Sequence, residues 1–175
     1  QNEVVKDDGK PYVVYTPYSR KWVAKFEEEG IENYPSESLL DNLYQEKKLP
    51  EITTTEMGFS PASLVPKAYQ FDDQLIDQYE ATRNFPATDS TSRLGVHLRF
   101  GTQSIRDLVT KSASRKNPTF LKELIWREFF MQLLWHFPHT KERSFKKQYD
   151  RIQWRNDETE FKKWCEGETG YPLVD

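Results

Sequence analysis

A carboxylate, an indole and a guanidinium lie close together in one strongly apolar segment, "FLKELIWREFFMQLLWHF", residues 120–137. At about 100° per residue, Glu123, Trp126 and Arg127 project from the most aromatic side of a helix. A flat indole can stack on a planar heterocycle while a neighbouring carboxylate accepts hydrogen bonds from its N–H groups. Burying both ions without a function is costly, but a structural ion pair beneath a core tryptophan stays an open alternative.

Two other polar residues of this segment, Glu128 and Gln132, share a different side of the expected helix. Their four-residue spacing is typical of a strip that faces solvent. We therefore expect both side chains to be exposed.

The stretch "DSTSRLG", residues 89–95, places three hydroxyl side chains and Arg93 directly before an apolar turn. Hydroxyl donors, a guanidinium and free N–H groups at a helix start can together hold a phosphate or pyrophosphate. Serine and threonine are also favoured as ordinary helix N-caps, so the motif alone favours a cap.

The stretch "YEATR" places Tyr79 and Arg83 four residues apart, on one helix face. Such a pair can serve a cofactor phosphate or a nucleic-acid backbone. A solvated cation beside a half-buried ring is more common, so the pair is a weak signal by itself.

Catalysis by side chains alone has little support in the sequence. His136 and His139 form an HxxH pair, but neither the single cysteine, Cys165, nor a Cys/His cluster completes a ligand set, so we expect no metal site. There is also no glycine-rich phosphate loop and no Ser–His–Asp pattern. If the protein is an enzyme, a cofactor therefore supplies the chemistry.

Composition limits the remaining classes. The chain has 175 residues, enough for a sizeable core, and its net charge of -3 gives no global basic signature for nucleic acid. The single cysteine excludes an internal disulfide and favours a reducing compartment. No apolar run approaches the ~20 residues of a membrane-spanning helix and no secretory signal begins the chain, so we expect a cytoplasmic protein without a membrane partner. The missing initiator Met and the abrupt end at "GYPLVD" indicate a piece of a longer protein.

The elements that carry these residues are expected to be mainly helical. Residues 12–16 form a strand-like run, and a helical pattern follows from Pro17 to Gly30. Residues 31–70 are weakly periodic and rich in proline, so we expect a linker with one short helix at 38–45.

Helical spacing dominates from residue 71 onward. The expected helices cover residues 71–83, 104–114, 117–136 and 157–167. Trp135 and Trp164 are expected to lie in the core.

Four motifs follow one another along the chain: "TSRLGVHLRFG", "FLKELIWREFF", "RIQW" and "WCEGETGYPLVD". In this order and with these gaps, the chain resembles the photolyase/cryptochrome flavoprotein family, most of all the bacterial class I enzymes for cyclobutane pyrimidine dimers. The resemblance covers nearly the whole chain. It implies the tail of an α/β antenna domain at 1–30, an interdomain linker at 31–70, and the first part of the all-helical FAD-binding domain at 71–175.

The resemblance also implies roles for individual positions. Glu123 and Trp126 match residues that hold a flipped-out dimer, Arg83 matches a basic residue that contacts DNA, and Trp154 matches the outermost tryptophan of the electron-transfer chain. The matches to FAD contacts are Tyr79, Thr91, Ser92, Arg93, Leu94, Gly95, Phe120 and Arg127, the last of which lies near both flavin and substrate. The family usually has serine at Gly95 and often tryptophan at Phe120, so a hydroxyl and an N–H donor are lost there.

The implied activity is light-driven DNA repair, in which reduced FAD donates an electron to a cyclobutane dimer, the dimer splits and the electron returns. Glu123 and Trp126 favour this enzyme over a cryptochrome photoreceptor, because a signalling relative has less need of a carboxylate and an indole that hold a dimer. The cryptochrome and, as a third possibility, a (6-4) photolyase with an additional His pair stay as alternatives. A second antenna chromophore, of folate or deazaflavin type, is expected in the full-length protein.

The full-length protein is expected to be a monomer that binds damaged DNA. This chain alone is expected to bind no FAD tightly and to be inactive. The aromatic arc around Trp126 is expected to be unusually exposed or covered by a neighbouring molecule, which favours self-association.

Overall fold

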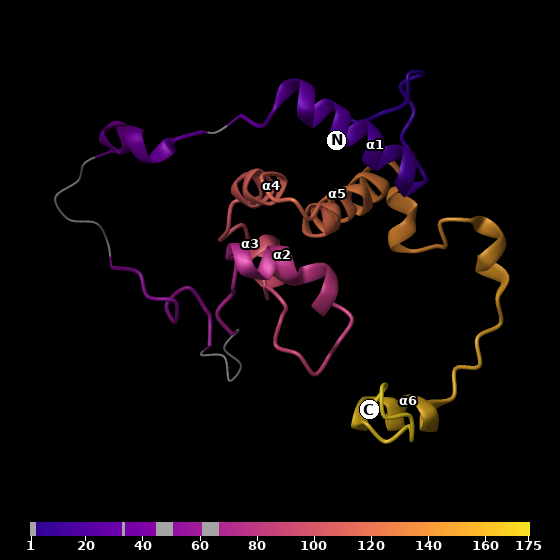
Figure 1. The fold of residues 1–175 in the computed structure, drawn as a ribbon. Coiled ribbons are helices and arrows are strands. Elements are labelled where there is room, and N and C mark those ends of the chain that lie inside the picture. Colours follow the sequence, from indigo (N-terminus) through magenta and orange to yellow (C-terminus); the bar gives the residue numbers. More distant parts are fainter. Residues whose placement is uncertain (1–2, 33, 45–50, 61–66) are drawn as a thin grey trace. The chain divides into compact units, whose positions relative to one another are not determined.

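The computed structural model describes residues 3–32, 34–44, 51–60 and 67–175, and regular structure in these ranges is almost entirely helical (Figure 1). The α-helices are α1 (Tyr15–Glu29), α2 (Asp73–Thr82), α3 (Gly95–Phe100), α4 (Ile105–Ala113), α5 (Thr119–His136) and α6 (Glu158–Glu166). Short 3₁₀ helices occur at η1 (Ser36–Asn42), η2 (Pro138–Lys141) and η3 (Lys147–Arg151). The expected mainly α fold class is confirmed.

The chain divides into two compact units, Gln1–Leu133 and Leu134–Asp175. The first unit holds α1 to α4 and most of α5, with every candidate residue except Trp154. The second holds the last residues of α5, η2, η3 and α6. The domain boundaries expected from the sequence stay a prediction, because this division reflects compactness alone.

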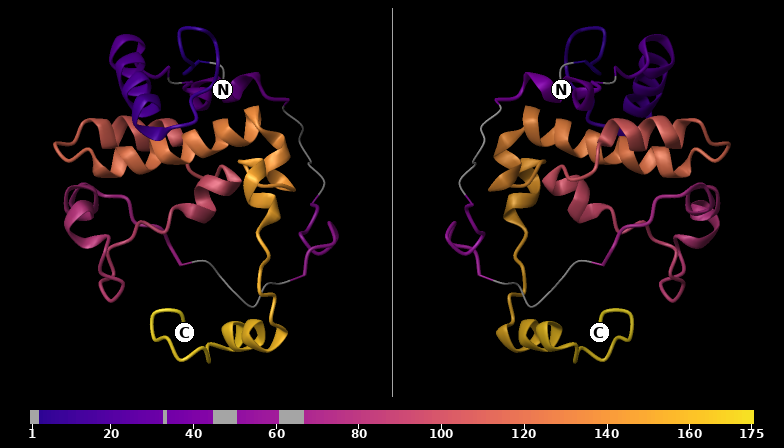
Figure 2. Two further views of the ribbon diagram at one scale, coloured as in Figure 1. Left: turned by 90° about the vertical axis from the view of Figure 1, so that its right-hand side faces the viewer. Right: turned by 90° about the vertical axis from the view of Figure 1, so that its left-hand side faces the viewer.

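The core of the first unit is built from α1, α2, α4 and α5. Helix α1 lies against α5, and α4 runs alongside α5 (Figure 2). The buried apolar side chains are Val4, Tyr18, Trp22, Ile76, Leu94, Leu108, Val109, Phe120, Leu124, Ile125 and Phe129. Burial of each large side chain contributes about 1.5–3 kcal/mol, so these contacts fix the helices that carry the candidate residues.

Several helix ends follow from local chemistry. The side chains of Asp72, Ser104 and Asp157 each accept a hydrogen bond from a backbone N–H in the first turn of the following helix. Such a cap stabilises a helix start by about 1 kcal/mol. Gly101 and Gly167 end α3 and α6 in the left-handed conformation that glycine adopts without strain. The helices expected from residue 71 onward are confirmed.

The strand expected at residues 12–16 is wrong. Among the described residues the only strand-like pairing is an isolated antiparallel bridge between Val5 and Pro11, and α1 already begins at Tyr15. A lone strand has no partner for its backbone groups, so side-chain packing on helices decides the local structure. Tyr12 illustrates this, because its ring lies edge-on to Tyr18 with centroids 6.2 Å apart.

The short helix expected at 38–45 is the 3₁₀ helix η1, and residue 45 lies outside the described residues. Within the described part of the chain, no helix combines the length and the hydrophobicity needed to cross a membrane.

The expectation that Glu128 is exposed is confirmed, although its carboxylate accepts a hydrogen bond from Trp22 Nε1 at 2.8 Å. Two other expectations about exposure are wrong. Gln132, expected to be exposed, is 2% exposed. Trp22 of α1 contacts this side of α5 at Glu128, so the four-residue spacing does not mark a strip that faces only solvent. Trp135 and Trp164, expected in the core, are 61% and 58% exposed.

Candidate functional site

Phe120 and Tyr79, both predicted to flank a cofactor, are in mutual contact. Phe120 is buried, and its ring lies edge-on to that of Tyr79 on α2, with centroids 5.0 Å apart. Phe71, just before α2, tilts against the same phenylalanine at 5.4 Å. Burial, followed by the negative charge of Glu123, raises the pKa of Tyr79, so its hydroxyl stays protonated and can donate a hydrogen bond.

Glu123 forms a salt bridge with Arg83, which joins α5 to α2. The two side chains are 37% and 36% exposed, so solvent screens part of their attraction. The hydrogen bond from Arg83 to Glu123 raises the pKa of the guanidinium. The residues predicted for DNA contact and for dimer binding are therefore brought together, and Arg83 holds the carboxylate in a defined position.

Trp126 is covered on one face by Tyr15, the first residue of α1. The two ring centroids are 3.5 Å apart and the planes differ by 6°. The Tyr15 hydroxyl donates a hydrogen bond to the carbonyl oxygen of Lys122 at 3.0 Å. Phe130 contacts the same indole at 5.4 Å and is 59% exposed. The aromatic arc is thus partly exposed and partly covered by Tyr15 of the same chain, rather than by a neighbouring molecule.

Sequence reasoning missed Tyr15, because the strand expected at 12–16 hid it. The available signal was the spacing of Tyr15, Tyr18 and Trp22, which are three and four residues apart and share one helix face. In the structure these three residues form the side of α1 that lies against α5.

Arg127 contacts α3 rather than Glu123. Its Nη2 donates a hydrogen bond to the carbonyl oxygen of Leu98 at 3.2 Å. Since Glu123 pairs with Arg83, the structural Glu123–Arg127 ion pair considered from the sequence is not the arrangement found among the described residues. Arg127 instead ties the end of α3 to the middle of α5.

The loop at 89–95 does not act as an ordinary helix cap. Helix α3 begins at Gly95 after Leu94, and no side chain accepts a capping hydrogen bond in this described segment. Arg93 has a left-handed backbone with φ 54° and pairs with Asp89, while the carbonyl oxygen of Ser92 accepts a hydrogen bond from Gln70 N–H at 2.9 Å. The alternative of a simple cap therefore loses its support.

Trp154 belongs to the second unit and lies between η3 and α6. It is 71% exposed. An outermost member of an electron-transfer chain needs such contact with solvent, but its role stays a prediction.

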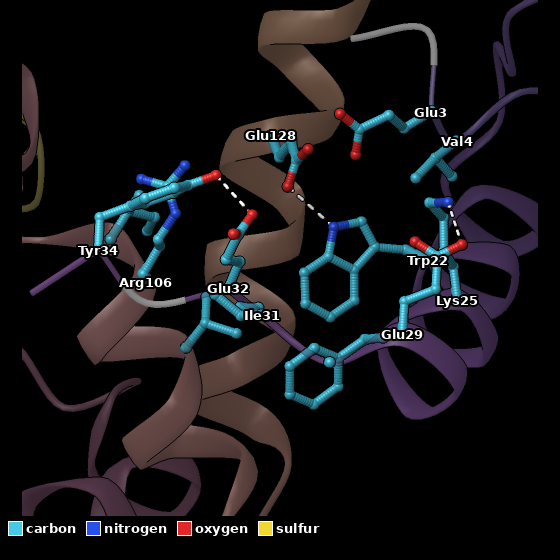
Figure 3. A pocket seen from close by; sticks show the side chains of 14 residues that line it. Glu3, Val4, Trp22, Lys25, Glu29, Ile31, Glu32, Tyr34, Arg106 and Glu128 are labelled. Carbon is cyan, nitrogen blue, oxygen red and sulfur yellow. Dashed lines mark hydrogen bonds and ion pairs between the residues drawn. The ribbon is translucent and has the colours of Figure 1, made fainter.

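Two cavities in the described residues are lined by side chains other than the candidate residues themselves. The larger, about 540 Å³, lies between α1, α4 and α5 and is shown in Figure 3. Its walls include Trp22, with Nε1–H directed at Glu128, and Tyr34, whose hydroxyl donates a hydrogen bond to Glu32. The smaller, about 200 Å³, lies beside α2 and the loop around Asp89. Three or more metal-binding side chains do not come together anywhere in the described ranges.

The donor set of the loop fits the phosphates of a dinucleotide cofactor. Thr91 is exposed and Ser92 partly so, and neither hydroxyl caps a helix in this described segment. Arg93 adds a guanidinium that can exchange Asp89 for a phosphate, because the pair is at the surface. Leu94, 3% exposed, anchors the loop in the core.

Comparison with known proteins gives a consistent answer. Residues 120–175 match the family model described as the FAD binding domain of DNA photolyase. The chain is 33% identical to a deoxyribodipyrimidine photo-lyase of Agrobacterium fabrum, over 95% of this chain and 39% of the relative. It is 32% identical to the protein of the same name from Vibrio cholerae, over 95% of this chain and 40% of the relative. It is 28% identical to the deoxyribodipyrimidine photo-lyase of Escherichia coli, over 98% of this chain and 40% of the relative.

The resemblance to DNA photolyases inferred from the four motifs is confirmed by these matches. The chain spans about 40% of the length of the curated relatives it matches.

Proposed function

We propose that this chain forms the lesion-facing and flavin-facing part of an enzyme that repairs cyclobutane pyrimidine dimers in DNA with light. The observation that carries the proposal is the pairing, on one side of α5, of a stacked indole at Trp126 with a positioned carboxylate at Glu123. That side belongs to the segment that matches the FAD binding domain of DNA photolyase. The named relatives support the enzyme class.

Tyr79, Thr91, Ser92, Arg93 and Phe120 are the residues proposed to hold FAD. The hydroxyls and the guanidinium would bind its phosphates, while Phe120 and Tyr79 would provide an aromatic wall. When bound and reduced, FAD supplies the light-driven electron that splits the dimer. Leu94, Gly95 and Arg127 are included because their positions match FAD contacts of the family. Arg127 fixes α3 through its hydrogen bond to the carbonyl oxygen of Leu98.

Glu123, Trp126 and Arg83 are proposed to receive the lesion. A dimer leaves the DNA stack at a cost of only a few kcal/mol, because damaged bases are already poorly stacked. Trp126 would contact the flat ring, and Glu123 would accept hydrogen bonds from its N–H groups. Arg83 is proposed to contact a DNA phosphate while it holds Glu123, because a guanidinium carries five N–H donors and the salt bridge is about one-third exposed. Trp154 is proposed to pass electrons from the surface during photoreduction.

The test uses the complete protein as encoded, because the relatives are longer than this chain. Its flavin is reduced, and loss of cyclobutane dimers from an oligonucleotide is followed under blue light and in the dark. Repair that occurs only in the light is expected. Signalling without repair would favour a cryptochrome, and loss of (6-4) lesions alone would favour the other photolyase type. Absence of light-dependent loss of cyclobutane dimers contradicts the proposal.

Glu123→Gln should weaken dark binding of dimer-containing DNA by about tenfold or more, because a hydrogen bond to a charged group contributes about 1.5–3 kcal/mol. Glu27→Gln is the matched control, since Glu27 is an exposed carboxylate on α1. If Glu123→Gln and Glu27→Gln bind dimer-containing DNA with equal affinity, Glu123 is not part of the proposed site.

A further inference from the structure

Tyr15 and Trp126 make the closest and most nearly parallel contact among the ring pairs of the described residues. Their centroids are 3.5 Å apart at 6°, whereas the other pairs are 4.6–6.2 Å apart. Carbon atoms in contact are already about 3.5–4 Å apart, so no third ring fits between these two. One face of the indole is therefore closed, and a planar ligand has access only to the other face or the edges.

Two independent contacts hold Tyr15 against α5. Its hydroxyl donates to the carbonyl oxygen of Lys122, in the helical turn that precedes Trp126. Its ring lies edge-on to Phe129 at 5.8 Å, and Phe129 is 3% exposed. The hydrogen bond and the ring contact thus fix the phenol relative to the same two turns of α5 that carry Trp126.

The rest of α1 makes this position rigid. Tyr18 is 1% exposed and packs on Phe129 at 5.2 Å. Trp22, one turn later, donates its indole N–H to Glu128 at 2.8 Å. These contacts anchor α1 along α5, so the start of α1 cannot move away from Trp126 without breaking buried contacts.

Beside Tyr15, a second ring stacks on Trp126, and the indole keeps part of its surface exposed. Phe130 contacts the indole at 5.4 Å with planes 24° apart and is 59% exposed. Glu123, one turn earlier on α5, keeps 37% of its side chain exposed. A planar, hydrogen-bonding ligand can therefore reach both the carboxylate and the indole from solvent.

We propose that Tyr15 is a positioning residue for lesion recognition: it closes one face of Trp126, fixes the orientation of the indole, and leaves only the exposed remainder of the ring for the flat rings of the damaged bases. This inference rests on the proposed function, because it assigns Trp126 to the lesion. It extends the site to α1, a segment to which neither the family match at 120–175 nor the four sequence motifs assign a role. Tyr15 does not touch the lesion and acts through Trp126.

The consequence for binding follows from preorganisation. An indole without its backing ring samples other side-chain rotamers, and the lesion must then select the productive one on binding. Removing the Tyr15 ring should therefore weaken binding of the lesion and leave binding of undamaged DNA unchanged, because phosphate contacts lie elsewhere.

The experiment compares four variants of the complete protein: Tyr15→Leu, Tyr15→Phe, Tyr12→Leu and Trp126→Phe. Dark affinity for a dimer-containing and an undamaged oligonucleotide is measured, together with KM and kcat of repair under blue light. Tyr15→Leu should weaken lesion binding about tenfold and raise KM similarly, with kcat within about twofold. Tyr15→Phe keeps the ring and should rescue lesion affinity to within about threefold. Tyr12→Leu, a neighbouring tyrosine without contact to Trp126, should leave the lesion preference unchanged.

The outcomes separate this inference from the proposed function. If Trp126→Phe weakens lesion binding while Tyr15→Leu binds as the unmodified protein does, Tyr15 has no positioning role and the proposed function stands. If Trp126→Phe has no effect, the assignment of Trp126 fails and the inference fails with it. Equal loss of affinity for damaged and undamaged DNA in Tyr15→Leu also overturns the inference. Should the leucine variant not melt cooperatively, Tyr15→Met, which keeps apolar volume without a flat face, is measured against the same criteria.

Discussion

Gln132 is a polar side chain in an apolar position. It is 2% exposed, and neither its amide oxygen nor its amide nitrogen has a hydrogen-bond partner among the described residues. A buried polar group without a partner costs about 1–3 kcal/mol, because it loses its hydrogen bonds to water on folding. Its neighbours along the helix, Phe129 and Leu133, are buried and partly buried.

Replacing Gln132 with leucine should therefore stabilise the chain. The expected gain is about 1–2 kcal/mol, which corresponds to a rise in melting temperature of roughly 2–8 °C for a chain of this size. Thermal unfolding followed by circular dichroism measures it. Gln74→Leu, at an exposed position on α2, is the control and should change the stability by less than about 0.5 kcal/mol. A lower melting temperature for Gln132→Leu would show that the amide has a partner in solution.

The residue types in the candidate site could be read from the sequence, but their partners could not. Spacing on one helix placed Glu123 beside Arg127, because only contacts within a helix are visible in a single segment. The structure pairs Glu123 with Arg83 from α2 and stacks Trp126 on Tyr15 from α1. Both partners come from elements far away in the sequence, so tertiary packing decides them.

At the scale of elements, Arg115 connects the end of α4 to α2. Its guanidinium donates to Asp73 at 2.9 Å through Nη1 and to Asp77 at 3.0 Å through Nε. The hydrogen bond from Arg115, together with its positive charge, outweighs the opposing effect of desolvation and holds the pKa of Asp77 below its ordinary value of 3.8. Arg115 thus links α4 to α2, the helix that lies beside the candidate loop and carries Arg83 of the Glu123 salt bridge at its end.

The lowered pKa of Asp77 predicts a specific pH dependence. A carboxylate with a lower pKa in the folded state stabilises the fold above its unfolded pKa, and this contribution is lost as pH falls through the folded value. Asp77→Asn should therefore lower the melting temperature at pH 6, and the difference from the unmodified chain should shrink below about pH 4. Asp41→Asn, in the exposed η1, is the control. A difference that is constant from pH 6 to acid would contradict the linkage.

Helix limits could be predicted where the chain carries its own signals. Asp72, Ser104 and Asp157 cap helices through their own side chains, and Gly167 ends α6, so local chemistry decides these ends. The run at 12–16 was predicted wrongly because its valines and tyrosines favour a strand only where a neighbouring strand exists. The structure instead places the end of this run in the first turn of α1, and its rings pack on rings of α1 and α5.

At the scale of the whole molecule, the candidate flavin residues line neither of the two cavities described for this structure. The cavities of about 540 and 200 Å³ in the described residues are lined by other side chains. Phe120 and Tyr79 contact each other, and Thr91 lies at the surface. Tight binding of a large cofactor requires burial of most of its surface in a preformed pocket. We therefore expect these residues to form one wall of a flavin site rather than a complete one.

We accordingly expect the 175-residue chain, purified by itself, to carry no stoichiometric flavin. The measurement is the absorbance spectrum of the purified chain, followed by titration with FAD and detection by flavin fluorescence. The complete protein, prepared in parallel, is the control and should retain yellow colour through gel filtration. Ser92→Ala in the complete protein should lower FAD retention, because a hydroxyl proposed to bind the phosphates is lost. A yellow 175-residue chain with one flavin per molecule would contradict the prediction and would mean that the wall described here closes around the cofactor by itself.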